Sequence, residues 1–142
     1  MILEENMQQL FLSIPDANIR EQLIFGRDYD PDNYRGTCQF DNLSFQKAKE
    51  LMERGYLSPE DKQNEAPTAQ EFVDFMAAHD PDNWFLHGYV VSPYREDVRV
   101  SIEGIGSVGP ITDHDMVDFL RTFRHADSLI AEDEQPVFCW YD

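Results

Sequence analysis

The chain has 142 residues, of which 28 are acidic and 11 basic, so its formal net charge is −17, and 42% of its residues are hydrophobic. This length fits a single domain spanning residues 1–142, and the apolar content is sufficient for a hydrophobic core, which excludes an intrinsically disordered chain. The charge argues against direct nucleic-acid binding and against an anionic membrane surface, because both need clustered lysine and arginine.

The N-terminal sequence and the cysteines indicate a cytoplasmic protein. Residues 1–5 lack the positive charge and the following apolar run of a signal peptide, and no stretch approaches the length of a membrane span. The two cysteines, Cys38 and Cys139, form no CxxC pair, so they suggest neither a zinc ribbon nor a redox motif. We expect both to be free thiols in a reducing compartment.

Residues 1–40 are rich in turn-forming residues and form the least regular part of the pattern. Apolar residues between Leu3 and Phe11 have helical spacing, which predicts a short helix. Ser13 and Pro15 interrupt that spacing and can begin a second helical segment, which continues through Ile19, Leu23 and Ile24. The glycines, prolines and aspartates of residues 26–36 predict turns.

Two helices are predicted in the middle of the chain. The first lies near residues 44–54, where Asn42 or Ser44 can cap its N-terminus and Gly55 can end it in a left-handed conformation. The second lies near residues 68–79 and begins with a capping box. Its apolar stripe comprises Phe72, Phe75, Met76 and His79.

A third helix is predicted near residues 112–125, after the capping residue Thr112. Its expected core stripe is formed by Met116, Leu120 and Phe123, with Val117 and Phe119 at the sides. Acidic residues in its first turn and arginines near its end match the helix dipole.

Three strands are predicted near residues 84–92, 97–105 and 136–141, because these segments are rich in aromatic and β-branched residues. The glycines that follow residue 103 read as a mobile exit from the second strand. The combination predicts an α+β fold, in which an antiparallel sheet of at least three strands has helices packed on one face.

The first two predicted strands form a hairpin, and its loop length decides which residues face the core. A four-residue loop from Pro93 to Glu96 pairs Ser92 with Asp97, so that His87 and Tyr89 face the core. The opposite face then carries Trp84, Leu86 and Val90 with Arg99, Ser101 and Glu103. A loop one residue longer would exchange the two faces.

The motifs that could carry chemistry are each broken at a necessary residue. The aspartate run that begins at Asp28 resembles a calcium loop, but Asn33 and Gln39 occupy the positions of its glycine and its bidentate glutamate. His114 and Asp118 have helical spacing but no further ligands. The glycine-rich segment 104–109 has no phosphate-loop lysine and precedes no helix directly. We therefore expect no metal site, no cofactor and no catalytic residue.

The predicted hairpin carries the candidate binding residues, which are Trp84, His87, Tyr89, Arg95, Arg99 and Glu103. The two arginines can bind an acidic group of a ligand, or they can neutralise nearby carboxylates such as Asp97 and Glu103. The second interpretation is favoured, because acidic residues are so numerous.

The sequence matches no family motif, and its charge is the main indication of function. A net charge of −17 exceeds the magnitude of about 2–8 that serves solubility. We expect a small acidic interaction protein, for example an inhibitor or immunity-type protein that binds a basic partner. The alternatives are a small enzyme with a site near residues 84–105 and a structural or assembly protein that forms a homodimer.

Overall fold

The computed structural model describes residues 9–142, so most of the helix predicted between Leu3 and Phe11 lies outside the described residues. In chain order the elements are α2 (Ile14–Phe25), β1 (Thr37–Ser44), α3 (Phe45–Glu53), α4 (Ala69–Ala78), the short 3-10 helix η1 (Pro81–Asn83), β2 (Trp84–Val91), β3 (Val100–Ser107), α5 (Asp113–Phe123), β4 (Ser128–Ile130) and β5 (Phe138–Trp140).

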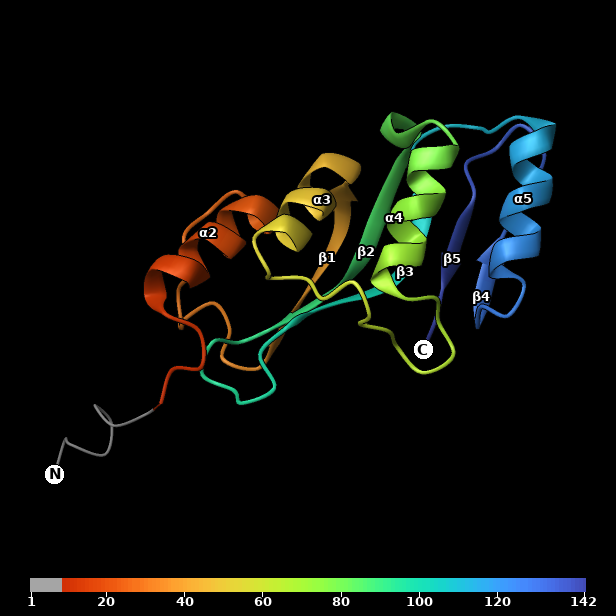
Figure 1. Ribbon diagram of the computed structural model, residues 1–142. Coiled ribbons are helices and arrows are strands. Elements are labelled where there is room, and N and C mark those ends of the chain that lie inside the picture. Colours follow the sequence, from red (N-terminus) through yellow and green to blue (C-terminus); the bar gives the residue numbers. More distant parts are fainter. Residues whose placement is uncertain (1–8) are drawn as a thin grey trace, which may run out of the picture.

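The five strands form one antiparallel sheet in the order β1-β2-β3-β5-β4. Helices α3, α4 and α5 lie on the same side of this sheet, and α2 packs beside α3 at the β1 edge (Figure 1). The predicted α+β class, with an antiparallel sheet and helices on one face, is therefore confirmed. Among residues 9–142, no helix combines the length and the apolar composition that crossing a bilayer requires.

Local capping signals define the helix ends as predicted. The Ser44 side chain accepts a hydrogen bond from the Lys47 amide, and the Thr68 side chain accepts one from the Glu71 amide. The Glu71 carboxylate in turn accepts the Thr68 N–H at 2.9 Å, which completes the predicted capping box. Gly55 has a φ of 83°, in the left-handed region that favours glycine after a helix.

The core lies between the sheet and the helices and is strongly aromatic. Phe72 of α4 stacks on Phe123 of α5 at 5.6 Å between ring centroids, and Trp84 of β2 stacks on Phe119 at 5.9 Å. The predicted core stripe of α5 was partly wrong, because Phe119 is fully buried while Leu120 is 41% exposed. The helix is rotated so that Phe119 meets the rings of β2 and α4.

The predicted register of the hairpin was wrong, and the longer loop is the one observed. Val90 pairs with Val100, and the Val91 N–H donates to the Arg99 carbonyl, so the connection between the strands is longer than four residues. Because side chains alternate along a strand, this shift exchanges the two faces. Trp84, Leu86 and Val90 therefore face the helices, and His87 and Tyr89 face the opposite side.

Two strands, β1 and β4, were not predicted. β1 contains Asp41 and Asn42, which are poor strand residues, and its pairing with β2 shifts between Phe40 and Leu43. β4 has only three residues and lies at the other edge of the sheet. Both strands are held by pairing with an inner strand rather than by their own propensity.

Cys38 and Cys139 are free thiols, as predicted. Cys38 lies on β1 and Cys139 on β5, and β2 and β3 separate these strands. Three strand spacings amount to about 14 Å, which is twice the Cα separation that a disulfide allows.

Candidate functional site

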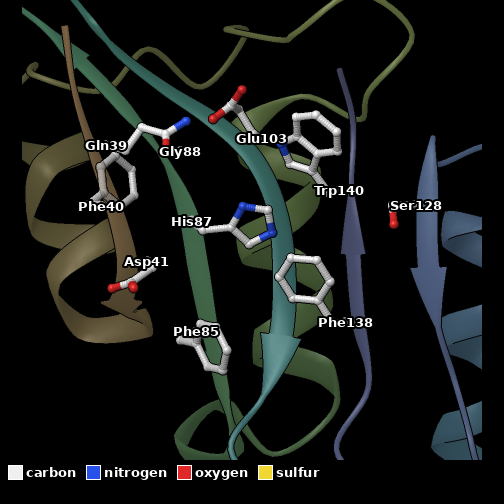
Figure 2. A pocket seen from close by; sticks show the side chains of 10 residues that line it. All are labelled: Gln39, Phe40, Asp41, Phe85, His87, Gly88, Glu103, Ser128, Phe138 and Trp140. Carbon is white, nitrogen blue, oxygen red and sulfur yellow. The ribbon is translucent and has the colours of Figure 1, made fainter.

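The face of the sheet that lies opposite the helices, called here the open face, contains a hollow of about 710 Å³. Figure 2 shows its side chains, which come from all five strands. The hollow is defined by ten residues: Gln39, Phe40, Asp41, Phe85, His87, Gly88, Glu103, Ser128, Phe138 and Trp140.

The floor of the hollow is made by aromatic rings that lie across two glycines of β3. Phe85 packs over Gly106, where an added Cβ would come within 2.6 Å of the ring. The His87 ring occupies the space that a Cβ at Gly104 would need. These glycines lie inside β3 and make room for the rings, so the exit from the strand begins only after Ser107 and not directly after residue 103. On β5, Phe138 pairs with Gly106 and Trp140 with Gly104.

His87 is held in one orientation by two contacts. Its Nε2 lies 2.8 Å from the carbonyl oxygen of Cys139, and its ring stacks on Phe138 at 4.7 Å between centroids. Because a carbonyl only accepts, Nε2 carries the hydrogen and Nδ1 of the neutral ring is an acceptor. Figure 2 shows Nδ1 on the side of the ring toward Glu103. Within residues 9–142, Nδ1 has no hydrogen-bond partner.

The protonation of His87 follows from its environment. His87 is only 7% exposed, and this burial lowers its pKa below the ordinary value of 6.5. The hydrogen bond to Cys139 and the negative charge of Asp41 act in the opposite direction and are weaker. His87 is therefore a neutral acceptor near pH 7.

Glu103 reaches the hollow because of a β-bulge. His87 pairs with Gly104 and Gly88 with Ile102, so Glu103 has no partner residue on β2. Glu103 is 8% exposed, and the Trp140 side chain donates a hydrogen bond to its carboxylate. Within residues 9–142, no lysine, arginine or histidine forms an ion pair with this carboxylate. Burial raises the pKa of Glu103 above 4.5, the Trp140 hydrogen bond opposes the rise, and the Asp142 charge adds to it.

A second irregularity brings Asp41 to the rim of the hollow. The shift in β1 between Phe40 and Leu43 leaves Asp41 opposite the part of β2 that carries His87. Asp41 is exposed, and its charge acts on His87. The hollow therefore has one buried and one exposed carboxylate, which approach His87 from β3 and β1.

A smaller hollow of about 340 Å³ adjoins this site through the shared residue Gln39, and it holds the arginines of the hairpin. Arg95 and Arg99 both pair with Asp97, at 2.7 Å and 3.2 Å. Arg99 also donates to the Tyr89 hydroxyl at 2.8 Å. The favoured interpretation, neutralisation of a nearby carboxylate, is observed for Asp97 but not for Glu103.

The six candidate residues from the sequence divide into three groups. His87 and Glu103 meet in the hollow, whereas Tyr89, Arg95 and Arg99 lie in the adjoining one. Trp84 is 2% exposed beneath the helices, where its indole N–H donates to the His79 carbonyl. In the sequence, Asp41, Phe85, Phe138 and Trp140 were missed. The alternation Phe138-x-Trp140 on a terminal strand is the signal that could have indicated a second aromatic face.

The polar groups of the hollow determine which ligands it suits. Its ten lining residues include no lysine or arginine, while they include two carboxylates and a histidine acceptor. A phosphate or carboxylate would therefore meet repulsion, and a cation with N–H donors would be attracted. Among residues 9–142, no group of three or more His, Cys, Asp and Glu side chains could hold a metal ion. Asp118, considered above with His114, instead bonds His79 at 2.9 Å.

Comparison of the chain with protein-family models, with curated proteins and with solved structures finds no match.

Proposed function

We propose that this protein acts by binding a basic protein through the open face of its sheet. The observation that carries this proposal is the hollow itself, in which the half-exposed rings of Phe85, Phe138 and Trp140 line the same cavity as the carboxylates of Glu103 and Asp41. Binding energy at protein interfaces is concentrated in a few aromatic anchors, and opposite charge on the partner adds speed and specificity.

The charge of the whole chain supports a basic partner rather than an acidic one. At a net charge of −17, the protein attracts cations over about a Debye length, which is roughly 8 Å at physiological salt. Inhibition of the partner, as an immunity-type protein would do, is the form of function that such a small acidic chain suits.

The experiment is capture of partners by the immobilised protein at low salt, followed by elution at high salt and identification by mass spectrometry. We expect a protein of high isoelectric point, captured by the wild type but reduced at least about tenfold by Trp140→Ala, since hot-spot truncation costs 2 kcal/mol or more. Leu120→Ala, on the outer side of α5, is the matched control and should capture normally. A partner whose capture is indifferent to salt and to Trp140→Ala would contradict the proposal.

A second candidate function is a small enzyme, and one specific observation favours it. His87 and Glu103 lie in the same hollow with pKa values displaced toward each other, as in many acid–base sites. To distinguish the two, the mass of a captured partner is measured before and after incubation with the protein. A mass change that is lost in His87→Gln would favour the enzyme, whereas an unchanged mass favours binding alone.

A homodimer through the same face is the remaining alternative. Light scattering with size-exclusion chromatography measures the mass of the protein in solution. A doubled mass that Trp140→Ala reduces to the monomer would replace the proposed partner by a second copy of this chain.

A further inference from the structure

We infer that the hollow on the open face receives an arginine side chain of the partner, with the guanidinium against the aromatic rings and its N–H groups directed at Glu103. This inference rests on the proposed function and specifies the chemistry of its central contact. The argument uses the acceptors of the hollow, the shape of its rings and the state of Glu103.

The fixed polar groups of the hollow are acceptors. His87 uses its only N–H on the Cys139 carbonyl, so its Nδ1 can only accept. The Glu103 and Asp41 carboxylates are acceptors when ionised. Gln39 and Ser128, also at the hollow, can adopt either role. A matching ligand must therefore bring several donors, and a guanidinium has five N–H groups and no acceptor.

The rings of the hollow suit a planar cation. His87 and Phe138 are stacked within 13° of parallel, and the end of the Phe85 ring packs against Gly106. A guanidinium stacks on aromatic faces and keeps its donors in its own plane, so that it can contact a ring and a carboxylate together. An ammonium is a compact, strongly hydrated charge that would lose more hydration in this apolar setting. Arginine is therefore preferred over lysine.

Glu103 provides the site for the charge. Glu103 as a residue is 8% exposed, its carboxylate accepts a hydrogen bond from the Trp140 side chain, and no lysine, arginine or histidine of residues 9–142 forms an ion pair with it. A buried carboxylate without a counter-ion is costly, and an arriving guanidinium removes that cost. The free protein is thus prepared for a cation that residues 9–142 do not supply.

The test is an NMR titration that uses the two tryptophan indole N–H signals. Trp140 lies in the hollow, whereas Trp84 is buried under the helices and serves as an internal reference. The probes are N-acetyl-arginine amide, its uncharged citrulline analogue and N-acetyl-lysine amide, at pH 7.5 and constant ionic strength. We expect a saturable shift of the Trp140 signal with arginine, at an affinity at least about tenfold above that for citrulline. The Trp84 signal should not move.

Two charge-neutral variants locate the contact. Glu103→Gln keeps an acceptor for Trp140 and should weaken arginine binding about tenfold. Glu53→Gln removes the same charge from α3, on the other side of the sheet, and should leave the affinity unchanged. Asp41→Asn, at the exposed rim, should have an intermediate effect.

Several outcomes would overturn the inference. These are an unresponsive Trp140 signal up to the solubility limit of the probe, equal or tighter binding of citrulline or lysine, and equal effects of Glu103→Gln and Glu53→Gln.

Failure of the proposed function can be distinguished from failure of this inference. If arginine binds as expected but no basic protein is captured, the guanidinium site stands and the partner proposal falls. If a basic protein is captured but arginine does not bind, the partner proposal stands and the guanidinium site falls.

Discussion

Glu103 is a residue whose position costs the folded state free energy. A bulge in β3 directs its carboxylate into the hollow, where burial disfavours ionisation. Sites that bind a charged ligand often retain such a group at the expense of stability. This cost to stability can be measured on the protein alone, without any knowledge of the partner.

The first prediction concerns the stability of Glu103→Gln. The pKa of Glu103 is raised above 4.5 on folding, so the carboxyl loses its proton less readily in the folded state than in the unfolded chain. The unfolding free energy of the wild type therefore falls as pH rises through the raised pKa. The variant should therefore have a higher melting temperature than the wild type at pH 7, and little or no advantage at pH 4, where the carboxyl is protonated. Thermal unfolding at both pH values tests this. Asp41→Asn, at an exposed carboxylate, should change little at either pH, and a lower melting temperature for Glu103→Gln at pH 7 would contradict the argument.

The second prediction concerns His87. Its pKa is lowered on folding, so the unfolded chain binds the proton more readily, and the stability contributed by the neutral ring falls as pH decreases below 6.5. A Glu103→Gln background removes the neighbouring carboxylate, and among residues 9–142 the charge that then acts on the ring is that of Asp41. In that background, the protein that keeps His87 and the one that also carries His87→Gln should differ in unfolding free energy, and this difference should become smaller from pH 7 to pH 5. Denaturant unfolding at several pH values measures it, and a difference that is constant with pH would show that the ring is not desolvated.

The third prediction concerns the glycines under the rings. A Cβ at Gly104 would overlap the Cys139 carbonyl, which is backbone and unable to yield, so Gly104→Ala should lose about 3 kcal/mol of unfolding free energy. At Gly106 the Cβ meets the end of the Phe85 ring, which can turn, and the loss should be about 1 kcal/mol. Gly36→Ala, in open space, is the control and should stay within about 0.5 kcal/mol. Equal losses at Gly104 and Gly106 would contradict this account of the floor.

At the scale of elements, the helices were predictable because their signals are local. The caps at Ser44, Thr68 and Thr112 each act within three residues, and each begins a helix in the structure. The rotation of a helix about its axis is less local, since it depends on what lies beneath. In α5 the rings of Trp84 and Phe75 favour Phe119 over Leu120 as the buried residue.

The fourth prediction follows from this rotation of α5. Phe119→Ala should cost about 3–5 kcal/mol, because it leaves a cavity among stacked rings. Leu120→Ala, one residue further and on the exposed side, should change stability by less than about 1 kcal/mol. Urea unfolding of both variants provides the measurement. A larger loss of unfolding free energy for Leu120→Ala than for Phe119→Ala would contradict this rotation and support the core stripe predicted from the sequence.

At the scale of the whole molecule, the charge governs how fast a partner arrives. The fifth prediction is that association with the basic partner slows at least about tenfold between roughly 50 mM and 500 mM NaCl, while dissociation changes much less. Neutralising the exposed acids at 132–134, between β4 and β5, should likewise lower the on-rate more than it raises the off-rate. Surface plasmon resonance separates the two rates. An effect confined to the off-rate would argue against steering by charge.

The sequence by itself determined the α+β class, three of the helices and the free cysteines. These follow from composition, capping and periodicity, which act over a few residues. The sequence named His87 and Glu103 as candidate binding residues but placed them on opposite faces of the hairpin. The orientation of the hairpin was not determined, because side chains alternate with a period of two and one residue of loop length exchanges the faces.

Only the tertiary structure decided that there is a site. The bulges that direct Glu103 and Asp41 to the hollow arise from pairing between strands distant in sequence. The wall formed by Phe138 and Trp140 comes from the last strand, β5, which pairs with β3 although thirty residues separate the two strands in the chain. Such long-range pairing depends on how the whole sheet closes over its core, and no local pattern in the sequence contains that information.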